Sequence, residues 1–238
     1  IVIATDADVD ALTYCWEQMD DGAGQTTTNS GARANKPTGP NWRSYSPSSS
    51  PSRYMPLLSR VIANQLFTAG SEINVEYLSS VSRTLNFSFT VRDNAGLQSQ
   101  TDTDNMVVTT NASAGPFTVS SPNTAVTWQA GTNQTVTWNV AGTTANGVNA
   151  AYVDIYLSND GGNTYPILLA SKVPNDGSET ILVPNNTGAT KRVMVKGWDH
   201  IFYQFNLISG RASTDHNDVA FGFYVLCSIW AYIEYLEK

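Results

Sequence analysis

Charged residues are scarce in this sequence, and that scarcity limits the classes of protein that fit it. Only 14% of the 238 residues are charged, and 13 Lys and Arg against 20 Asp and Glu give a net charge of -7. Basic patches for nucleic acid or for an anionic membrane are therefore not expected. The polar surface must be built mainly from uncharged side chains, because the chain contains 26 Thr and 21 Asn.

Cysteine and histidine are rarer still. Cys15 and Cys227 are too few for a disulfide framework and too far apart for a structural zinc site. A catalytic zinc normally takes three protein ligands, and His200 and His216 do not begin an H-E-x-x-H motif. The sequence also lacks the G-x-S-x-G motif of serine hydrolases. We therefore predict no zinc site and no enzyme activity in this chain.

Long apolar runs are missing, with one exception near the C-terminus. The longest run covers residues 220–233, which is shorter than the roughly 20 residues that span a bilayer. A membrane span is therefore not favoured. The first ten residues contain neither a basic region nor a long apolar stretch, so we expect any targeting sequence to lie upstream of Ile1.

The clearest pattern in the sequence is that of short β-strands in residues 114–208. Apolar residues alternate with Thr and Asn, as at Val136, Trp138 and Val140, and this period of two is typical of strands. The segment Asn159–Gly162 predicts the turn of a β-hairpin. We expect strands near residues 117–119, 126–128, 136–140, 151–158, 165–170, 181–183, 193–195 and 201–207. That number is typical of an immunoglobulin-like sandwich.

The first half of the chain is less regular. We expect strands at residues 11–18, 85–92 and 106–110, a long surface loop at 20–53, and one or two helical turns within 56–66. These strands are interpreted as a second sandwich that lacks its first strand. The predicted fold is therefore all-β, with two tandem immunoglobulin-like (fibronectin III-like) β-sandwich modules. The predicted domains are residues 1–113, residues 114–208 and an aromatic tail at 209–238.

The tail fits neither module, because nearly every position from 221 to 236 is apolar or aromatic. One interpretation is a terminal element buried on the core of its own chain. The other is a segment that docks on another chain, since a large exposed aromatic patch would make a monomer prone to aggregation. Phe221, Phe223 and Trp230 are its candidate binding residues.

A group of aspartates is the best candidate for a metal site. Asp6, Asp8 and Asp10 alternate before the strand at 11–18, and Asp102 and Asp104 are expected in the loop before the last strand of the module. In an immunoglobulin topology these two loops cluster at one end. Five carboxylates gathered there would repel one another unless a hard cation or water separated them. The alternatives are a calcium site and a solvated acidic rim.

Trp198 is the candidate binding residue within the second module. It lies in a predicted loop, where an exposed aromatic side chain can anchor a ligand or a partner. Packing against the core of the module is the alternative.

Five segments, at residues 4–20, 43–56, 117–123, 134–143 and 153–162, carry a resemblance to a known family. They resemble the non-catalytic part of secreted bacterial reprolysin-like zinc metallopeptidases, and the resemblance covers roughly residues 1–207. It implies a secreted or cell-surface protein with an upstream protease domain as partner. The catalytic motif of that family is absent from this chain. The resemblance therefore predicts an accessory, binding or spacer region of a metallopeptidase.

A second hypothesis does not depend on that resemblance. The chain would be a structural or adhesive subunit of an extracellular assembly, with neighbouring subunits joined through the tail or through open sheet edges. An upstream zinc-binding motif would favour the first hypothesis, and repeated subunits would favour the second.

Overall fold

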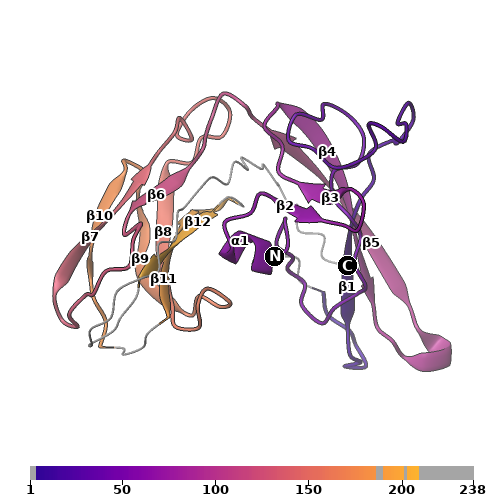
Figure 1. Ribbon diagram of the computed structural model, residues 1–238. Coiled ribbons are helices and arrows are strands. Elements are labelled where there is room, and N and C mark those ends of the chain that lie inside the picture. Colours follow the sequence, from indigo (N-terminus) through magenta and orange to yellow (C-terminus); the bar gives the residue numbers. More distant parts are fainter. Residues whose placement is uncertain (1–3, 186–189, 201–202, 209–238) are drawn as a thin grey trace. The chain divides into compact units, whose positions relative to one another are not determined.

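The computed structural model describes residues 4–185, 190–200 and 203–208 (Figure 1). Its contacts divide the described chain into two compact units. Unit 1 contains residues 4–58 and 67–110, and unit 2 contains residues 59–66 and 111–208. Most regular elements are antiparallel strands, so the all-β prediction is confirmed. The tail, with Phe221, Phe223 and Trp230, lies outside the described residues.

Unit 2 is a β-sandwich, visible on the left of Figure 1. One sheet has the strand order β10-β7-β6 and the other the order β12-β11-β8-β9. Its strands among the described residues are β6 (Thr118–Ser121), β7 (Asn133–Asn139), β8 (Tyr152–Ser158), β9 (Ile167–Pro174), β10 (Ser178–Leu182), β11 (Lys191–Gly197) and β12 (Tyr203–Ile208). All neighbouring strands are antiparallel.

The core of unit 2 is built from alternate positions of both sheets. Val136 and Trp138 of β7 and Ile181 of β10 belong to the same buried cluster as Ile155 of β8 and Val195 of β11. These four strands thus turn one face to the core, as the period of two predicts. The fourth strand, β9, pairs with β8, whereas the constant-type immunoglobulin order places that strand in the opposite sheet.

Two details of unit 2 differ from the sequence prediction. Residues 126–128 form no strand, although Val126 and Trp128 pack against the core from a loop. Strand β6 ends before Pro122, which lacks the amide hydrogen that a ladder needs. The predicted pairing of β8 with β9 is confirmed, but the connection is longer than a tight turn and spans residues 159–166.

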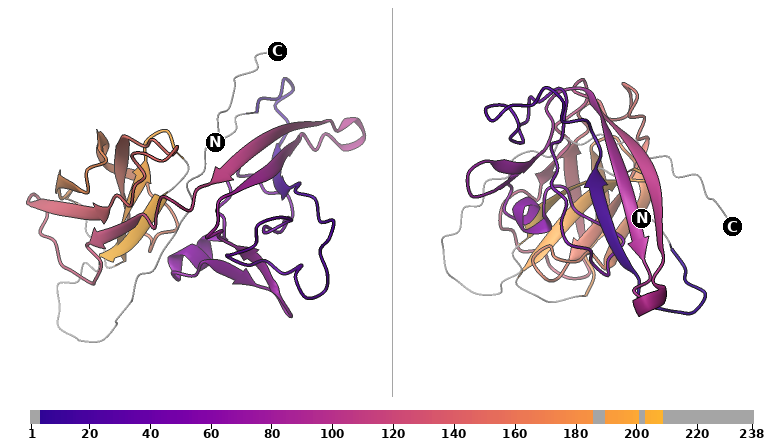
Figure 2. Two further views of the ribbon diagram at one scale, coloured as in Figure 1. Left: turned by 90° about the horizontal axis from the view of Figure 1, so that it is seen from above. Right: turned by 90° about the vertical axis from the view of Figure 1, so that its right-hand side faces the viewer.

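Unit 1 contains two separate antiparallel sheets in its described residues. Strands β1 (Thr13–Gln18), β4 (Arg83–Arg92) and β5 (Thr101–Thr110) form one sheet in the order β1-β4-β5. Strands β2 (Phe67–Ala69) and β3 (Asn74–Tyr77) form a short ribbon. Figure 2 shows the long β4–β5 hairpin with the 3-10 helix η1 (Gly96–Gln98) between its strands.

The prediction for the first module is therefore correct only in part. The three expected strands exist as β1, β4 and β5, but β5 begins at Thr101, five residues before the expected start at Met106. The described part of unit 1 has five strands, fewer than the seven of an immunoglobulin domain. The expected helical turn is present as α1 (Leu58–Ile62), but its residues from Ser59 onward belong to unit 2. No helix among the described residues is long and apolar enough to cross a membrane.

The segment at residues 20–53 has the irregular backbone that its composition predicts, but it is not a surface loop throughout. Ala32, Lys36, Asn41 and Trp42 are buried. A buried irregular segment must satisfy its backbone polar groups by other means than a helix or a sheet. The side chains that do so form the polar network described below.

Candidate functional site

Asp6, Asp8 and Asp10 lie in the exposed segment before β1, as expected. The Asp6 carboxylate accepts hydrogen bonds from the backbone N–H groups of Asp8 (3.1 Å) and Asp10 (2.8 Å). The chain curls at Val9, whose φ of 63° lies in the left-handed region where calcium loops place a glycine. One of the three carboxylates is thus engaged by its own backbone.

Asp102 and Asp104 lie within β5 and not in a loop before it, which corrects their predicted position. Each carboxylate accepts a hydrogen bond from the N–H of the next residue, at 2.8 Å and 2.7 Å. The described residues contain no group of three or more His, Cys, Asp or Glu placed to hold a metal ion. The five aspartates therefore do not form one cluster there, and calcium binding stays a prediction.

Trp198 is part of a surface group that we call the aromatic corner, made of Tyr152, Lys172 and Trp198. The two rings are nearly perpendicular, with an interplanar angle of 86° and centroids 6.3 Å apart. The Lys172 ammonium lies 4.0 Å from the Trp198 ring centroid and 5.5 Å from that of Tyr152. Both rings are partly open to solvent, with 37% of Trp198 and 41% of Tyr152 exposed.

The strands of unit 2 hold the aromatic corner in place. Tyr152 begins β8, and Trp198 directly follows β11. The backbone N–H of Trp198 donates a 2.9 Å hydrogen bond to the Tyr152 carbonyl. Lys172 lies in β9 with a φ of 50°, where the pairing of β8 with β9 shifts register. Asp154 of β8 fixes this irregular point by accepting hydrogen bonds from the Lys172 N–H (2.8 Å) and the Ser171 hydroxyl (3.1 Å).

The surroundings of the aromatic corner are polar. The Tyr156 hydroxyl donates to the second oxygen of Asp154 at 3.2 Å. Burial raises the pKa of Tyr156, and the neighbouring Asp154 carboxylate adds to the shift, so the phenol stays protonated and keeps its donor. The corner thus offers two ring surfaces, one ammonium group and neighbouring hydroxyl groups. This arrangement can bind a ligand but contains no nucleophile paired with a base.

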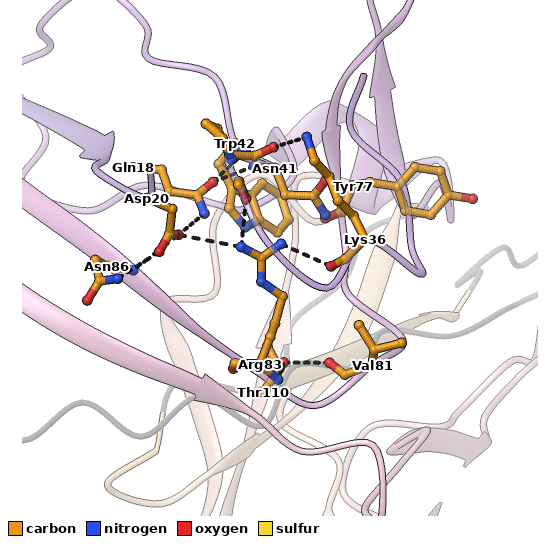
Figure 3. Close-up of polar contacts among 12 residues, drawn as sticks. Gln18, Asp20, Lys36, Asn41, Trp42, Tyr77, Val81, Arg83, Asn86 and Thr110 are labelled. Carbon is orange, nitrogen blue, oxygen red and sulfur yellow. Dashed lines mark hydrogen bonds and ion pairs between the residues drawn. The ribbon is translucent and has the colours of Figure 1, made fainter. Parts of the chain in front are cut away.

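A second group of polar residues, shown in Figure 3, lies in unit 1 and was not anticipated from the sequence. Arg83 of β4 donates to the carbonyls of Lys36 (3.0 Å) and Gly39 (2.6 Å), and its guanidinium is 3.7 Å from the Asp20 carboxylate. Lys36 is buried as well, and its ammonium donates to the carbonyls of Ser30 (2.9 Å) and Pro40 (2.7 Å). Burial lowers the pKa of Lys36.

The same network continues through two amide side chains. Gln18 accepts hydrogen bonds from the backbone N–H groups of Asn41 (2.6 Å) and Trp42 (2.8 Å) and donates to Asp20. Asn41 donates to the carbonyls of Arg33 (3.0 Å) and Tyr77 (2.8 Å). These side chains satisfy the backbone of the irregular segment, so their role is structural.

Unit 1 also contains a buried ion pair. Glu76 of β3 is fully buried and pairs with Arg53. Its second oxygen accepts hydrogen bonds from the Thr68 hydroxyl (2.6 Å) and the Leu57 N–H (3.3 Å). The Arg53 guanidinium also lies 4.7 Å from the Tyr45 ring centroid. The pair thus anchors residues 45–57 on the β2–β3 ribbon, which makes it another structural element.

Comparison with known proteins finds one family. Residues 121–225 match the family described as Kre9/KNH-like N-terminal Ig-like domain, a family of fungal cell-wall proteins. The match covers less than half of the 238 residues and includes β7 to β12 of unit 2. No curated protein and no solved structure gives a significant match to the chain.

This finding supports the immunoglobulin-like assignment of unit 2 and corrects two other expectations. The resemblance to bacterial metallopeptidase modules was wrong, because the family that matches is a fungal cell-wall family. The accessory role beside an upstream protease domain is wrong for the same reason. The Kre9/KNH family is non-catalytic, and its proteins are secreted or associated with the cell wall. Unit 2 is thus similar to a non-catalytic Ig-like domain of cell-wall proteins.

Proposed function

We propose that this chain is a non-catalytic, cell-wall-associated protein that takes part in the assembly of wall glucan. The observation that carries the proposal is the family match over residues 121–225, which include most of the sandwich of unit 2. The exposed aromatic corner on the same unit supports it, because it offers a surface for a ligand without catalytic groups.

The charge and composition of the chain are compatible with this role. A net charge of -7 disfavours contact with polyanions, whereas a surface rich in Thr and Asn suits an uncharged polysaccharide. Hydroxyl and amide groups can exchange hydrogen bonds with sugar hydroxyls at little desolvation cost compared with charged groups.

The proposal is tested in the organism that encodes the chain. Deleting the gene should lower the glucan content of purified cell walls, and a wild-type copy should restore it. The tagged protein should be recovered in the wall or the medium. An unchanged wall composition, together with a tagged protein confined to the cytoplasm, would refute the proposed function.

A second candidate is a structural or adhesive subunit of the wall, joined to its neighbours through sheet edges. Two exposed leucines favour it, because Leu168 lies on the edge strand β9 and Leu182 on the edge strand β10. Edge strands with exposed apolar side chains are typical sites for pairing with another chain. Light scattering after size-exclusion chromatography tests this candidate, and a strictly monomeric protein at all concentrations would remove it.

The finer interpretation of unit 1 also remains a proposal. Its sheet of β1, β4 and β5 is antiparallel, as in an immunoglobulin-like module that lacks its first strand. Exchanging unit 1 for an unrelated sandwich should preserve wall association, because the family match that carries the proposed function lies in unit 2.

A further inference from the structure

We infer that the aromatic corner of Tyr152, Lys172 and Trp198 is a binding site for one or two sugar rings of a neutral glucan chain. The inference rests on the proposed function for its choice of ligand, and it adds the site and the mode of contact. Trp138, which packs in the core of unit 2, is 4% exposed, whereas Trp198 is 37% exposed on the outer side of the same unit.

Backbone hydrogen bonds position the three residues of the corner. The Trp198 backbone N–H donates to the Tyr152 carbonyl at 2.9 Å, and the Lys172 backbone N–H donates to the Asp154 carboxylate at 2.8 Å. The two rings also contact each other edge to face. Trp and Tyr side chains have only two χ angles, so they lose little conformational entropy when a ligand packs on them.

The chemistry of the corner matches a glucose ring. A pyranose ring has faces of C–H bonds, which pack on aromatic surfaces, and a rim of hydroxyl groups, which need hydrogen-bond partners. Trp198 and Tyr152 supply two surfaces at 86° to each other. The exposed Lys172 ammonium lies over both rings, 4.0 Å from one centroid and 5.5 Å from the other. A sugar would pack on the ring surface that the ammonium leaves open and accept hydrogen bonds from it. The perpendicular rings suit one sugar held on two sides or two successive sugars.

Other ligands fit this corner less well. Nucleic acids and acidic polysaccharides are disfavoured by the net charge of -7. A protein partner is disfavoured because Lys172 is part of the corner, and lysine is depleted at the centre of protein interfaces. A specific protein interface also buries about 800 Å² on each side, which exceeds what two partly exposed rings offer.

The test measures binding of the purified full chain to glucan. Co-sedimentation with insoluble wall glucan and titration with soluble glucan oligosaccharides, followed by tryptophan fluorescence, give two independent affinities. Trp198→Ala and Tyr152→Ala should each weaken binding about tenfold. Trp198→Phe keeps a ring and should weaken it less. Leu182→Ala removes an apolar side chain that is more exposed, at 62%, elsewhere on unit 2, and it serves as the control.

The outcomes separate this inference from the proposed function. Weakened binding by both alanine variants, with melting temperatures and control binding unchanged, supports the inference. If the alanine variants melt lower, Lys172→Ala decides, because it keeps both rings and removes the ammonium donors. Binding no weaker than wild type in that variant then overturns the inference. Unchanged binding in all corner variants overturns the inference alone. A wild-type chain that binds no glucan also overturns it, and the gene-deletion assay then decides the proposed function separately.

Discussion

Asn175 is the residue on which the buried polar contacts of unit 2 converge. Its side-chain oxygen accepts a hydrogen bond from the Trp138 indole N–H at 2.8 Å. Its amide nitrogen donates to the Thr143 hydroxyl (3.0 Å) and to the Ala150 carbonyl (2.9 Å). One short side chain thus joins β7 to the loop before β8.

Replacing Asn175 with alanine should destabilise the protein. The Trp138 N–H and the Ala150 carbonyl would be buried without partners, at a cost of about 1–3 kcal/mol for each. Urea denaturation followed by tryptophan fluorescence measures the loss. Asn123→Ala, at an exposed asparagine of the same unit, is the control and should change stability by less than about 0.5 kcal/mol. Equal stabilities of the two variants would contradict the role given to Asn175.

In unit 1, Arg83 joins distant segments through buried hydrogen bonds, as Asn175 does in unit 2. Arg83→Met keeps much of the side-chain volume but removes the donors to the Lys36 and Gly39 carbonyls. Stability should fall by about 1.5–3 kcal/mol, the range for a hydrogen bond to a charged group. Hydrogen exchange should become faster within residues 30–42. Arg43→Met, at an exposed arginine of the same segment, should leave both quantities unchanged.

At the scale of elements, the connection between β8 and β9 is organised by one carboxylate. Asp160 accepts hydrogen bonds from the Thr164 hydroxyl (2.6 Å), the Thr164 N–H (2.9 Å) and the Ser158 hydroxyl (2.8 Å). The bonds from Thr164 are the largest cause that holds the pKa of Asp160 far below its usual value of 3.8. The charged form is therefore the one that the folded loop favours.

This shift predicts a specific dependence of stability on pH. Because the folded pKa is depressed, the contribution of Asp160 is fully present above pH 4 and is lost as the pH falls from about 4 toward the folded pKa. Asp160→Asn removes that titration, so its stability should fall less steeply below pH 4 than that of the wild type. Thermal unfolding between pH 2 and pH 7 measures both curves. Parallel curves would show that Asp160 does not contribute.

The β2–β3 ribbon shows why some elements cannot be found from a sequence pattern. Its buried face carries Thr68 and Glu76, which lie opposite each other, while Phe67 and Tyr77 stack beside them with centroids 5.4 Å apart. The usual alternation of apolar inside and polar outside is therefore reversed. A buried glutamate is tolerated here because Arg53 pairs with it, and that partner lies 23 residues away.

At the scale of the whole chain, unit 2 has a hydrophobic core of its own. The buried cluster of unit 2 runs from Ala114 to Val195 and includes no residue of unit 1. We therefore predict that a fragment of residues 111–208 folds and unfolds cooperatively by itself. Near-ultraviolet circular dichroism during urea denaturation is the measurement, and a fragment without a cooperative transition would contradict the prediction. The fragment lacks Ile62, whose carbonyl accepts a 3.1 Å hydrogen bond from Arg192. The loss of this one bond should lower the stability of the fragment only slightly.

The sequence by itself determined those strands and turns that follow from the pattern of residues close together along the chain. The period of two at 136–140 and 151–158 predicted β7 and β8, and Asn159–Gly162 marked the connection after β8. The family, by contrast, was predicted wrongly, since short strand phrases rich in Thr and Asn recur in unrelated sandwiches. Strand patterns follow from local alternation of side chains, so they can be recognised without a structure.

Only the tertiary structure decided which distant residues meet. Trp198 was a candidate from its position in a loop, but Tyr152 and Lys172 join it because three strands and one register shift bring them together. Arg83 and Lys36 likewise take their roles from carbonyls that an irregular segment leaves unpaired. Such contacts depend on which strands pair and on the path of the loops between them. Neither can be predicted from a local pattern of the sequence.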